Sequence, residues 1–211
     1  CKHLGQTIST IHILPFFPYS SDDGFSVIDY YEVNPKLGKW KDFESFHPQF
    51  ETMADLVLNH CSAQSEWFQN YLENEHPGTG YFIEADNSFD TSAVIRPRSS
   101  PLLKTVETSE GTKNVWCTFS HDQVDLNFEN PEVLYEVIRI LKFLVSKNIK
   151  YFRLDAIAFL WKRSGTACVH LKETHELVKL LRLILETLDP QSVIITETNV
   201  PNRENLSYFG N

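Results

Sequence analysis

The 211-residue chain has no apolar stretch near the roughly 20 residues that a membrane-spanning helix needs. Its first residues also lack a basic segment followed by an apolar one, the pattern of a secretory signal peptide. Positive charge is scarce as well, because 28 acidic residues outnumber 19 basic ones and the net charge is -9. Nucleic acids and anionic membranes select basic surfaces, so we expect neither as a partner and favour a neutral small molecule. The composition indicates no particular oligomeric state.

Cysteine is sparse too, with Cys1, Cys61, Cys117 and Cys168 far apart in the sequence. The chain contains no Cys-x-x-Cys pair, so neither a zinc site nor a dense disulfide framework is indicated. We expect reduced thiols, which favours a cytoplasmic protein. Only eight glycines are present, and none forms a glycine-rich phosphate-binding loop.

Hydrophobic periodicity predicts two amphipathic helices. The first follows Asn130-Pro131-Glu132, which supplies an N-cap, an N1 proline and an acidic first turn, and its apolar stripe continues to Val145. The second has an apolar stripe over residues 177–188 and ends before Pro190.

Four short apolar runs predict strands that alternate with helices, as in a parallel α/β sheet. These runs are Thr10–Leu14, Met53–Leu58, Lys150–Leu154 and Ser192–Thr196. Polar residues follow the strand ends, where a (β/α)8 barrel places its reactive groups. We therefore expect an α/β fold that is a partial (β/α)8 TIM barrel. The chain does not start with Met and is shorter than the about 250 residues of a complete barrel, so we expect a fragment with open, aggregation-prone sheet edges.

Residues 61–119 interrupt this pattern with aromatic, Pro, Ser and Asn-rich sequence, apart from a short helix predicted near Glu66–Leu72. Such a stretch is too long for an ordinary loop, which predicts an inserted subdomain. The expected organisation is a first barrel part over 1–60, the insert over 61–119, and a continued, truncated barrel over 120–211.

Two carboxylates end predicted strands that are separated by one helix. Arg153 and Asp155 stand two residues apart, so they lie on the same side of the strand, where an arginine would hold a nucleophilic carboxylate ionised. Glu197 ends the next strand. Retaining glycoside chemistry needs two carboxyl groups about 5–5.5 Å apart, one as nucleophile and one as acid/base. A structural ion pair and a solvent-facing glutamate are the alternative interpretations.

A third strand ends in Asn59-His60, where the imidazole would donate to a sugar hydroxyl or make a structural hydrogen bond. Here the chain resembles glycoside hydrolase family 13, the α-amylase superfamily, in its sucrose-phosphorylase-like branch. The resemblance spans nearly the whole chain. It is carried by Asp55-x-x-x-Asn59-His60, Arg153-x-Asp155, Glu197 and the branch-specific stretches 11–18, 21–25, 122–127 and 153–162.

The resemblance implies a retaining double displacement in which Asp155 forms a β-glucosyl-enzyme and Glu197 acts first as acid and then as base. It further implies that Arg153 orients the nucleophile, that Asp22 and His60 hold glucosyl hydroxyls, and that Phe25 stacks near the sugar. Asp22 also fits a solvated turn before Gly24. A third family aspartate belongs to a later strand that this sequence does not reach, so we expect the 211 residues alone to be inactive.

Two further features concern ions. The guanidinium groups of Arg96-Pro97-Arg98 suit a phosphate, although a solvated loop is the simpler interpretation. Asn59 matches a position that ligates calcium in many α-amylases, but it lacks acidic partners in the insert, and the branch works without that ion. We expect no metal and no cofactor, with inorganic phosphate as co-substrate.

Three functions stay open: an α-glucoside phosphorylase, a hydrolase or transglycosidase of the same family, and a non-catalytic sugar-binding relative. The branch-specific stretches favour the phosphorylase, acting on sucrose, sucrose 6-phosphate or a glucosylglycerate-type substrate. Residues 160–162 and 198–201 look closer to the glucosylglycerate type than to sucrose phosphorylase proper.

Overall fold

The computed structural model describes residues 7–198 and 202–209. Cys1 and positions 199–201 of the predicted acceptor-type motif lie outside these residues. The centre of the fold is a parallel sheet in the order β1-β2-β7-β8. Its strands are β1 (Thr10–Ile13), β2 (Glu51–Val57), β7 (Ile149–Asp155) and β8 (Val193–Thr196). All four predicted strands are confirmed within two residues at each end.

The register of the sheet aligns the strand ends that carry polar residues. Asp55 on β2 pairs with Arg153 on β7, and Leu154 on β7 pairs with Thr196 on β8. Because β7 lies between β2 and β8, the nucleophile predicted at its end has a neighbouring strand on each side. The strands that precede Asp155 and Glu197, β7 and β8, are consecutive in the sequence and are also neighbours in the sheet, and one long helix connects them.

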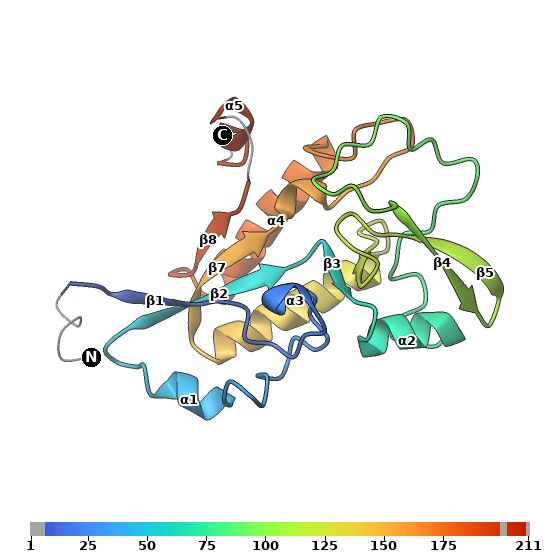
Figure 1. Cartoon of the computed structure of the whole chain (residues 1–211). Helices are drawn as coiled ribbons and strands as arrows, with labels where there is room; N and C mark the ends of the chain where they lie inside the picture. Colours follow the sequence, from blue (N-terminus) through green and yellow to red (C-terminus); the bar gives the residue numbers. More distant parts are fainter. Residues whose placement is uncertain (1–6, 199–201, 210–211) are drawn as a thin grey trace.

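The two long helices are α3 (Pro131–Ser146) and α4 (Lys172–Leu188), and they pack against each other alongside the sheet (Figure 1). The side chain of Asn130 caps α3 as predicted, accepting a hydrogen bond from the Glu132 amide at 3.0 Å. Helix α4 begins five residues before the predicted stripe. Its first turn is largely polar, so the apolar periodicity does not report it.

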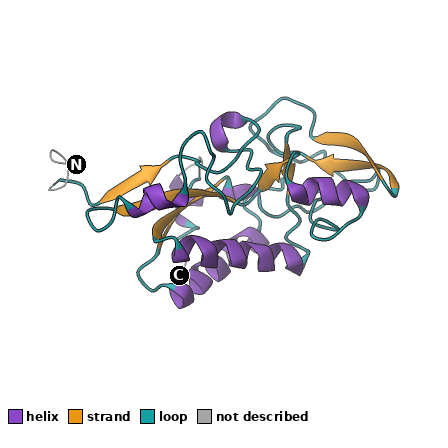
Figure 2. Cartoon of the chain, turned by 90° about the horizontal axis from the view of Figure 1, so that it is seen from below, coloured by secondary structure: helices purple, strands orange, loops and turns teal. Residues whose placement is uncertain are grey.

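The insert lies beyond the carboxyl end of β2, at one end of the molecule (Figure 1). It contains α2 (Glu66–Glu73), which matches the predicted short helix, and the hairpin β4 (Leu103–Thr108) and β5 (Gly111–Trp116). A second antiparallel pair joins β3 (His60–Ser62) to β6 (Gln123–Asp125), across the predicted boundary at residue 119. Seen from below, the insert's strands and helix lie apart from the long helices (Figure 2). The remaining short helices are η1 (Asp22–Gly24), α1 (Trp40–Glu44), η2 (Ile157–Phe159) and α5 (Asn202–Leu206).

A continuous apolar core joins the sheet, the long helices and much of the insert. A smaller cluster of Ala85, Trp116 and Cys168 links the insert to the loop that follows η2. Cys61, Cys117 and Cys168 are buried free thiols, as predicted. In the described part of the chain, no helix has the length and apolar character to cross a bilayer.

Candidate active site

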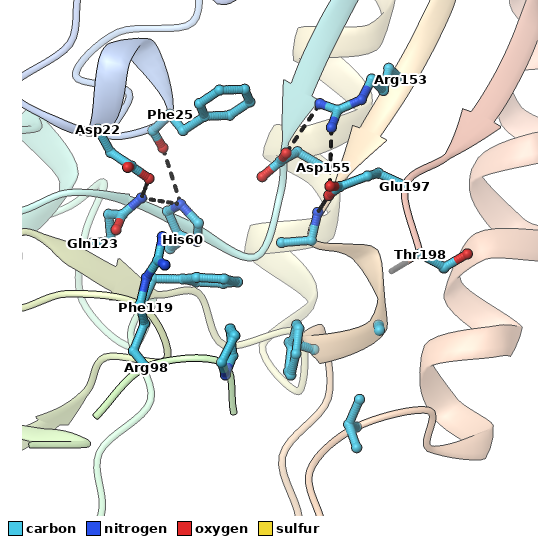
Figure 3. A pocket seen from close by; sticks show the side chains of 15 residues that line it. Asp22, Phe25, His60, Arg98, Phe119, Gln123, Arg153, Asp155, Glu197 and Thr198 are labelled. Atoms are coloured by element: carbon cyan, nitrogen blue, oxygen red, sulfur yellow. Dashed lines mark hydrogen bonds and ion pairs between the residues drawn. The ribbon is translucent and has the colours of Figure 1, made fainter. Parts of the chain in front are cut away.

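A pocket of about 490 Å³ opens at the carboxyl ends of the central strands, between the sheet and the insert (Figure 3). It gathers side chains from segments that are far apart in the sequence. All six predicted site residues line it: Asp22, Phe25, His60, Arg153, Asp155 and Glu197. The fold therefore brings together every residue that the sequence analysis selected for substrate binding or catalysis.

The guanidinium of Arg153 is the centre of the charged part of this pocket. Its Nη1 atom lies 3.2 Å from Asp155 Oδ1, which confirms that the two side chains share one side of β7. Its Nη2 atom lies 3.2 Å from Glu197 Oε1. One arginine thus contacts both predicted catalytic carboxylates and holds them on the same side of the pocket.

Asp55 supplies the closest partner of this arginine, with its Oδ1 atom 2.5 Å from Arg153 Nη1. Its other oxygen lies 2.9 Å from His12 Nε2, and its side chain is fully buried. A buried carboxylate with two such partners fixes the guanidinium from behind, because a paired ionic hydrogen bond is short and directional. The sequence placed Asp55 in the family motif but gave no sign of this contact, which depends on the register between β2 and β7.

Asp155 differs from the prediction in its ionisation. Burial raises its pKa most, the charges of Glu197 and Asp55 raise it further, and Arg153 lowers it, with a net pKa of about 7. This pKa is well above the ordinary value of an aspartate, so Arg153 alone does not keep the carboxylate ionised. The arginine acts in the expected direction, but desolvation and two neighbouring carboxylates outweigh it.

Glu197 follows the end of β8, and its backbone amide donates to the Leu154 carbonyl at 3.0 Å. Its Oε2 atom accepts a hydrogen bond of 3.1 Å from the amide of Ala156, the residue after the nucleophile. Ala156 has a φ of 51°, a left-handed conformation that disfavours a residue with a Cβ. With the Arg153 contact at Oε1, both oxygens of Glu197 have a partner, which holds this side chain in one orientation.

The loop around η1 brings Asp22 and Phe25 to the side of the pocket that faces Glu197 (Figure 3). The ring of Phe25 stacks over the Arg153 guanidinium at 5.9 Å, and Asp22 Oδ2 accepts a hydrogen bond of 2.9 Å from Gln123 Nε2. Asp22 and its neighbour Asp23 are both exposed, as expected of a solvated turn, while Asp22 also lines the pocket.

Asp122 anchors the same loop by accepting hydrogen bonds from the hydroxyl groups of Ser20, Ser21 and Ser26. Burial raises the pKa of Asp122, but these three donors together outweigh it, and the pKa lies below its usual range. The loop is thereby tied to the segment before β6, and this contact positions Asp22 and Phe25.

The position that suggested calcium holds an ammonium group instead. Lys162 Nζ lies 2.9 Å from Asn59 Oδ1 and 2.6 Å from Asp125 Oδ2, and it also donates to the Phe159 carbonyl. The side chains of Lys162 and Asp125 are almost completely buried. The polar oxygens beside Asn59 are therefore already paired with a cation from this chain.

The two arginines of the Arg96-Pro97-Arg98 segment differ in surroundings. Arg96 donates to the carbonyls of Cys117 and Thr118 and so has a structural role. Arg98 is exposed and lines the pocket (Figure 3). The solvated-loop interpretation is therefore wrong for Arg96, whereas the exposed Arg98 is compatible with it and also with a role in the pocket.

Four residues of this site were not predicted as such: Phe119, Gln123, Lys162 and His12, the partner of Asp55. Phe119 packs on the His60 ring at 5.1 Å between centroids, and Gln123 contacts Asp22. His12, Gln123 and Lys162 stand inside the stretches that carry the family resemblance, which is the signal that the sequence gave for them. Within the described residues, no group of three or more His, Cys, Asp or Glu side chains is arranged to hold a metal ion.

Known proteins share the sequence and the fold of this chain. The alpha-amylase family model, described as "Alpha amylase, catalytic domain", matches residues 1–211. The chain belongs to this family. It is 53% identical over 209 residues to the glucosylglycerate phosphorylase of Spirochaeta thermophila, which covers 99% of this chain and 36% of that protein. It is 49% identical to the glucosylglycerate phosphorylase of Escherichia coli K12, covering 98% of this chain and 37% of that protein.

Among solved structures, the sucrose 6F-phosphate phosphorylase from Thermoanaerobacter thermosaccharolyticum superimposes with a TM-score of 0.85 and 26% sequence identity. The match covers 93% of this chain and 43% of that chain. The resemblance to the phosphorylase branch and the partial barrel fold are thus confirmed. The chain spans a little over a third of the length of the curated relatives described above.

Proposed function

We propose that the protein containing this chain is an α-glucoside phosphorylase that transfers a glucosyl group with retention of configuration. Asp155 attacks the anomeric carbon, and a β-glucosyl ester forms as the glycosidic bond breaks. Glu197 gives its proton to the departing oxygen. Phosphate then attacks the anomeric carbon of this ester as its bond to Asp155 breaks, Glu197 takes the phosphate's proton, and α-glucose 1-phosphate leaves with the Asp155 carboxylate regenerated.

The observation that carries this proposal is the arrangement of the two carboxylates around one guanidinium. Arg153 contacts Asp155 through Nη1 and Glu197 through Nη2, at 3.2 Å in each case, in a pocket open to a small molecule. A solvated strand end or a structural ion pair requires no second carboxylate on the same arginine. A non-catalytic sugar-binding protein would likewise have no need of this trio.

The choice of phosphate and of a glucosylglycerate-type substrate has separate support. The similarity to glucosylglycerate phosphorylases near 50% identity favours that donor over sucrose or its 6-phosphate. Arg98 supports an anionic partner because it lines the pocket across from Asp155 and Glu197 (Figure 3). A guanidinium suits both a phosphate and the carboxylate of a glycerate.

We further propose that the reaction needs no metal or cofactor and that the protein is cytoplasmic. The pairing of Lys162 with Asn59 and Asp125 supports the first point, since those oxygens already have a cation. The three buried free thiols support the second. The partners are the α-glucoside and phosphate, with no nucleic acid or membrane; the net charge of -9 supports this.

The 211-residue chain by itself is proposed to be inactive. It covers 36% of the Spirochaeta relative, and the resemblance assigns a third aspartate to a later strand. The purified chain should release no glucose 1-phosphate from glucosylglycerate, and detectable release would overturn this point.

The full-length protein tests the main proposal. It should release glucose 1-phosphate from glucosylglycerate only when phosphate is present, and Asp155→Asn should abolish release. Release of free glucose at the same rate with or without phosphate would show a hydrolase instead. Binding of the glucoside without turnover, measured by calorimetry, would show a sugar-binding relative.

A further inference from the structure

The side-chain amide of Asn59 is held in one orientation by two opposite partners. Its Oδ1 atom lies 2.9 Å from the Lys162 ammonium, and its Nδ2 atom lies 2.9 Å from Asp125 Oδ2. An ammonium group can only donate hydrogen bonds, and an ionised carboxylate can only accept them. Turning the amide over would place nitrogen against nitrogen and oxygen against oxygen, so the amide has a single allowed orientation.

Asp125 acts as an acceptor in all of its contacts. The Thr118 amide donates to Oδ1 at 2.9 Å, and the Thr118 hydroxyl donates to Oδ2 at 2.6 Å. With Lys162 and Asn59, four donors converge on this one buried carboxylate. This arrangement matches the ionised form and fixes the surroundings of Asn59 from both sides.

The fixed amide determines which nitrogen of His60 carries the proton. Asn59 Nδ2 lies 3.2 Å from His60 Nδ1, and a donor in that place requires Nδ1 to have no hydrogen. The proton of a neutral imidazole then belongs on Nε2, which lies 3.0 Å from the Phe25 carbonyl, an acceptor. Burial, the largest effect, lowers the pKa of His60 below its usual value, in accord with the neutral form.

One contact favours the opposite tautomer. Gln123 Nε2 lies 3.1 Å from His60 Nε2, and its orientation is set by donation to Asp22 and by the Ser120 hydroxyl, which donates to Oε1. A proton on Nδ1 would allow this one hydrogen bond. The same tautomer would lose the hydrogen bond that Asn59 donates to Nδ1 and the one that Nε2 donates to the Phe25 carbonyl. The tautomer with its proton on Nε2 therefore makes two hydrogen bonds where the other makes one.

We infer that the buried Lys162–Asp125 ion pair, acting through Asn59, holds His60 in the tautomer that carries its proton on Nε2. The one hydrogen on Nε2 is directed at the Phe25 carbonyl, so a molecule in the pocket receives it only by sharing or replacing that acceptor, and the contacting group must offer a lone pair. Lys162, Asp125 and Asn59 are positioning residues in this arrangement. Only the identity of the bound molecule depends on the proposed function; the tautomer does not.

Nitrogen NMR of the full-length protein labelled with ¹⁵N-histidine tests the inference without any ligand. A long-range ¹H–¹⁵N correlation spectrum distinguishes the two neutral tautomers, and the signal missing from His60→Gln assigns the residue. We expect the proton on Nε2 at pH 8. A proton on Nδ1 in the wild-type protein would overturn the inference, whether or not the protein proves to be a phosphorylase.

Two variants test the positioning residues, and a third serves as a matched control. Lys162→Met removes the obligate donor and the counter-charge of Asp125, so both tautomers should become populated. Asn59→Asp replaces the donor by an acceptor and should move the proton to Nδ1. Thr118→Val removes a hydrogen bond to the same Asp125 oxygen but leaves both partners of Asn59, so the Nε2 proton should remain.

The outcomes separate a positioning role from a merely structural one. A folded Lys162→Met protein with the wild-type tautomer would show that the ion pair is not needed and would overturn the inference. A tautomer change in Thr118→Val would also overturn it, because any loosening of the site would then suffice. If Lys162→Met does not fold, the tautomer of His60 in Asn59→Asp tests the inference instead. A His60 that still carries its proton on Nε2 in this variant would contradict the inference.

Discussion

Arg153 donates its shortest hydrogen bond, 2.5 Å, to Asp55 rather than to the predicted nucleophile. The buried carboxylate on β2 therefore sets the orientation of the guanidinium, and the two carboxylates in the pocket are arranged around it. The proposed catalytic pair depends on a residue that does not itself line the pocket.

Replacing Arg153 by lysine should be severe despite the retained charge. An ammonium cannot contact Asp55, Asp155 and Glu197 together as a planar guanidinium does, and the buried Asp55 would lose the shorter of its two contacts. We expect kcat to fall by about two orders of magnitude and the free energy of unfolding by about 1–3 kcal/mol. Glucose 1-phosphate release and urea denaturation measure the two effects. Wild-type kcat in Arg153→Lys would contradict the orienting role.

The pKa of Asp155 predicts the acidic limb of the pH profile. Because the folded pKa is about 7, the carboxylate is protonated and unreactive below that pH, and kcat/KM should rise as pH increases through about 7. The charge of Glu197 contributes to the raised pKa. Glu197→Gln should therefore move this limb to lower pH.

That variant needs a substrate that does not require an acid. The rate of glucosyl-enzyme formation from α-glucosyl fluoride, whose leaving group needs no protonation, isolates the nucleophile. A limb that stays at the same pH in Glu197→Gln would contradict the coupling between the two carboxylates.

The same pKa has an opposite consequence for stability. A carboxylate with a pKa raised from 3.8 to about 7 on folding contributes stability that is complete below its unfolded pKa and is lost as pH rises through 7. Asp155→Asn removes the buried charge, so it should stabilise the protein at pH 8 by about 1 kcal/mol or more, and by much less at pH 4.5. Urea denaturation at both pH values checks this, and a variant that is less stable at pH 8 would contradict it.

Gly24 is required by both its backbone and its surroundings. Its φ is +112°, and a Cβ there would lie 2.6 Å from Pro15 Cβ and 2.9 Å from the Pro15 carbonyl oxygen. Gly24→Ala should destabilise the protein by about 1–3 kcal/mol and raise KM, because the loop carrying Asp22 and Phe25 must move.

Gly111→Ala is the matched control for that substitution. Gly111 has a nearly equal φ of +114°, but no atom lies within 4 Å of the added Cβ. Gly111→Ala should lower the free energy of unfolding only by the cost of a positive φ in a residue with a Cβ, and it should leave KM unchanged. Equal effects of the two substitutions on KM would contradict the role of the Gly24 loop.

Much of the fold follows from local patterns in the sequence. The strand that ends in Asp155, the strand before Glu197 and the helix between them were all predicted, because short apolar runs and a 3.6-residue period depend only on neighbouring residues. Their adjacency in a parallel sheet followed from the single intervening helix.

The partners that orient the site could not be predicted in the same way. Arg153 and Asp55 are 98 residues apart, and Lys162 and Asn59 are 103 residues apart. These contacts depend on strand register and on the packing of the insert, neither of which has a local signal. The raised pKa of Asp155 was missed for the same reason, since burial is a property of the assembled pocket.

The central claim is that Asp155 forms a covalent bond to the anomeric carbon of the sugar. A fluorinated α-glucosyl fluoride that slows release of the intermediate should label the full-length protein, and peptide mass spectrometry should find one glucosyl group on Asp155. The label should be absent in Asp155→Asn. A label on another residue, or steady turnover of glucosylglycerate by Asp155→Asn, would contradict the account.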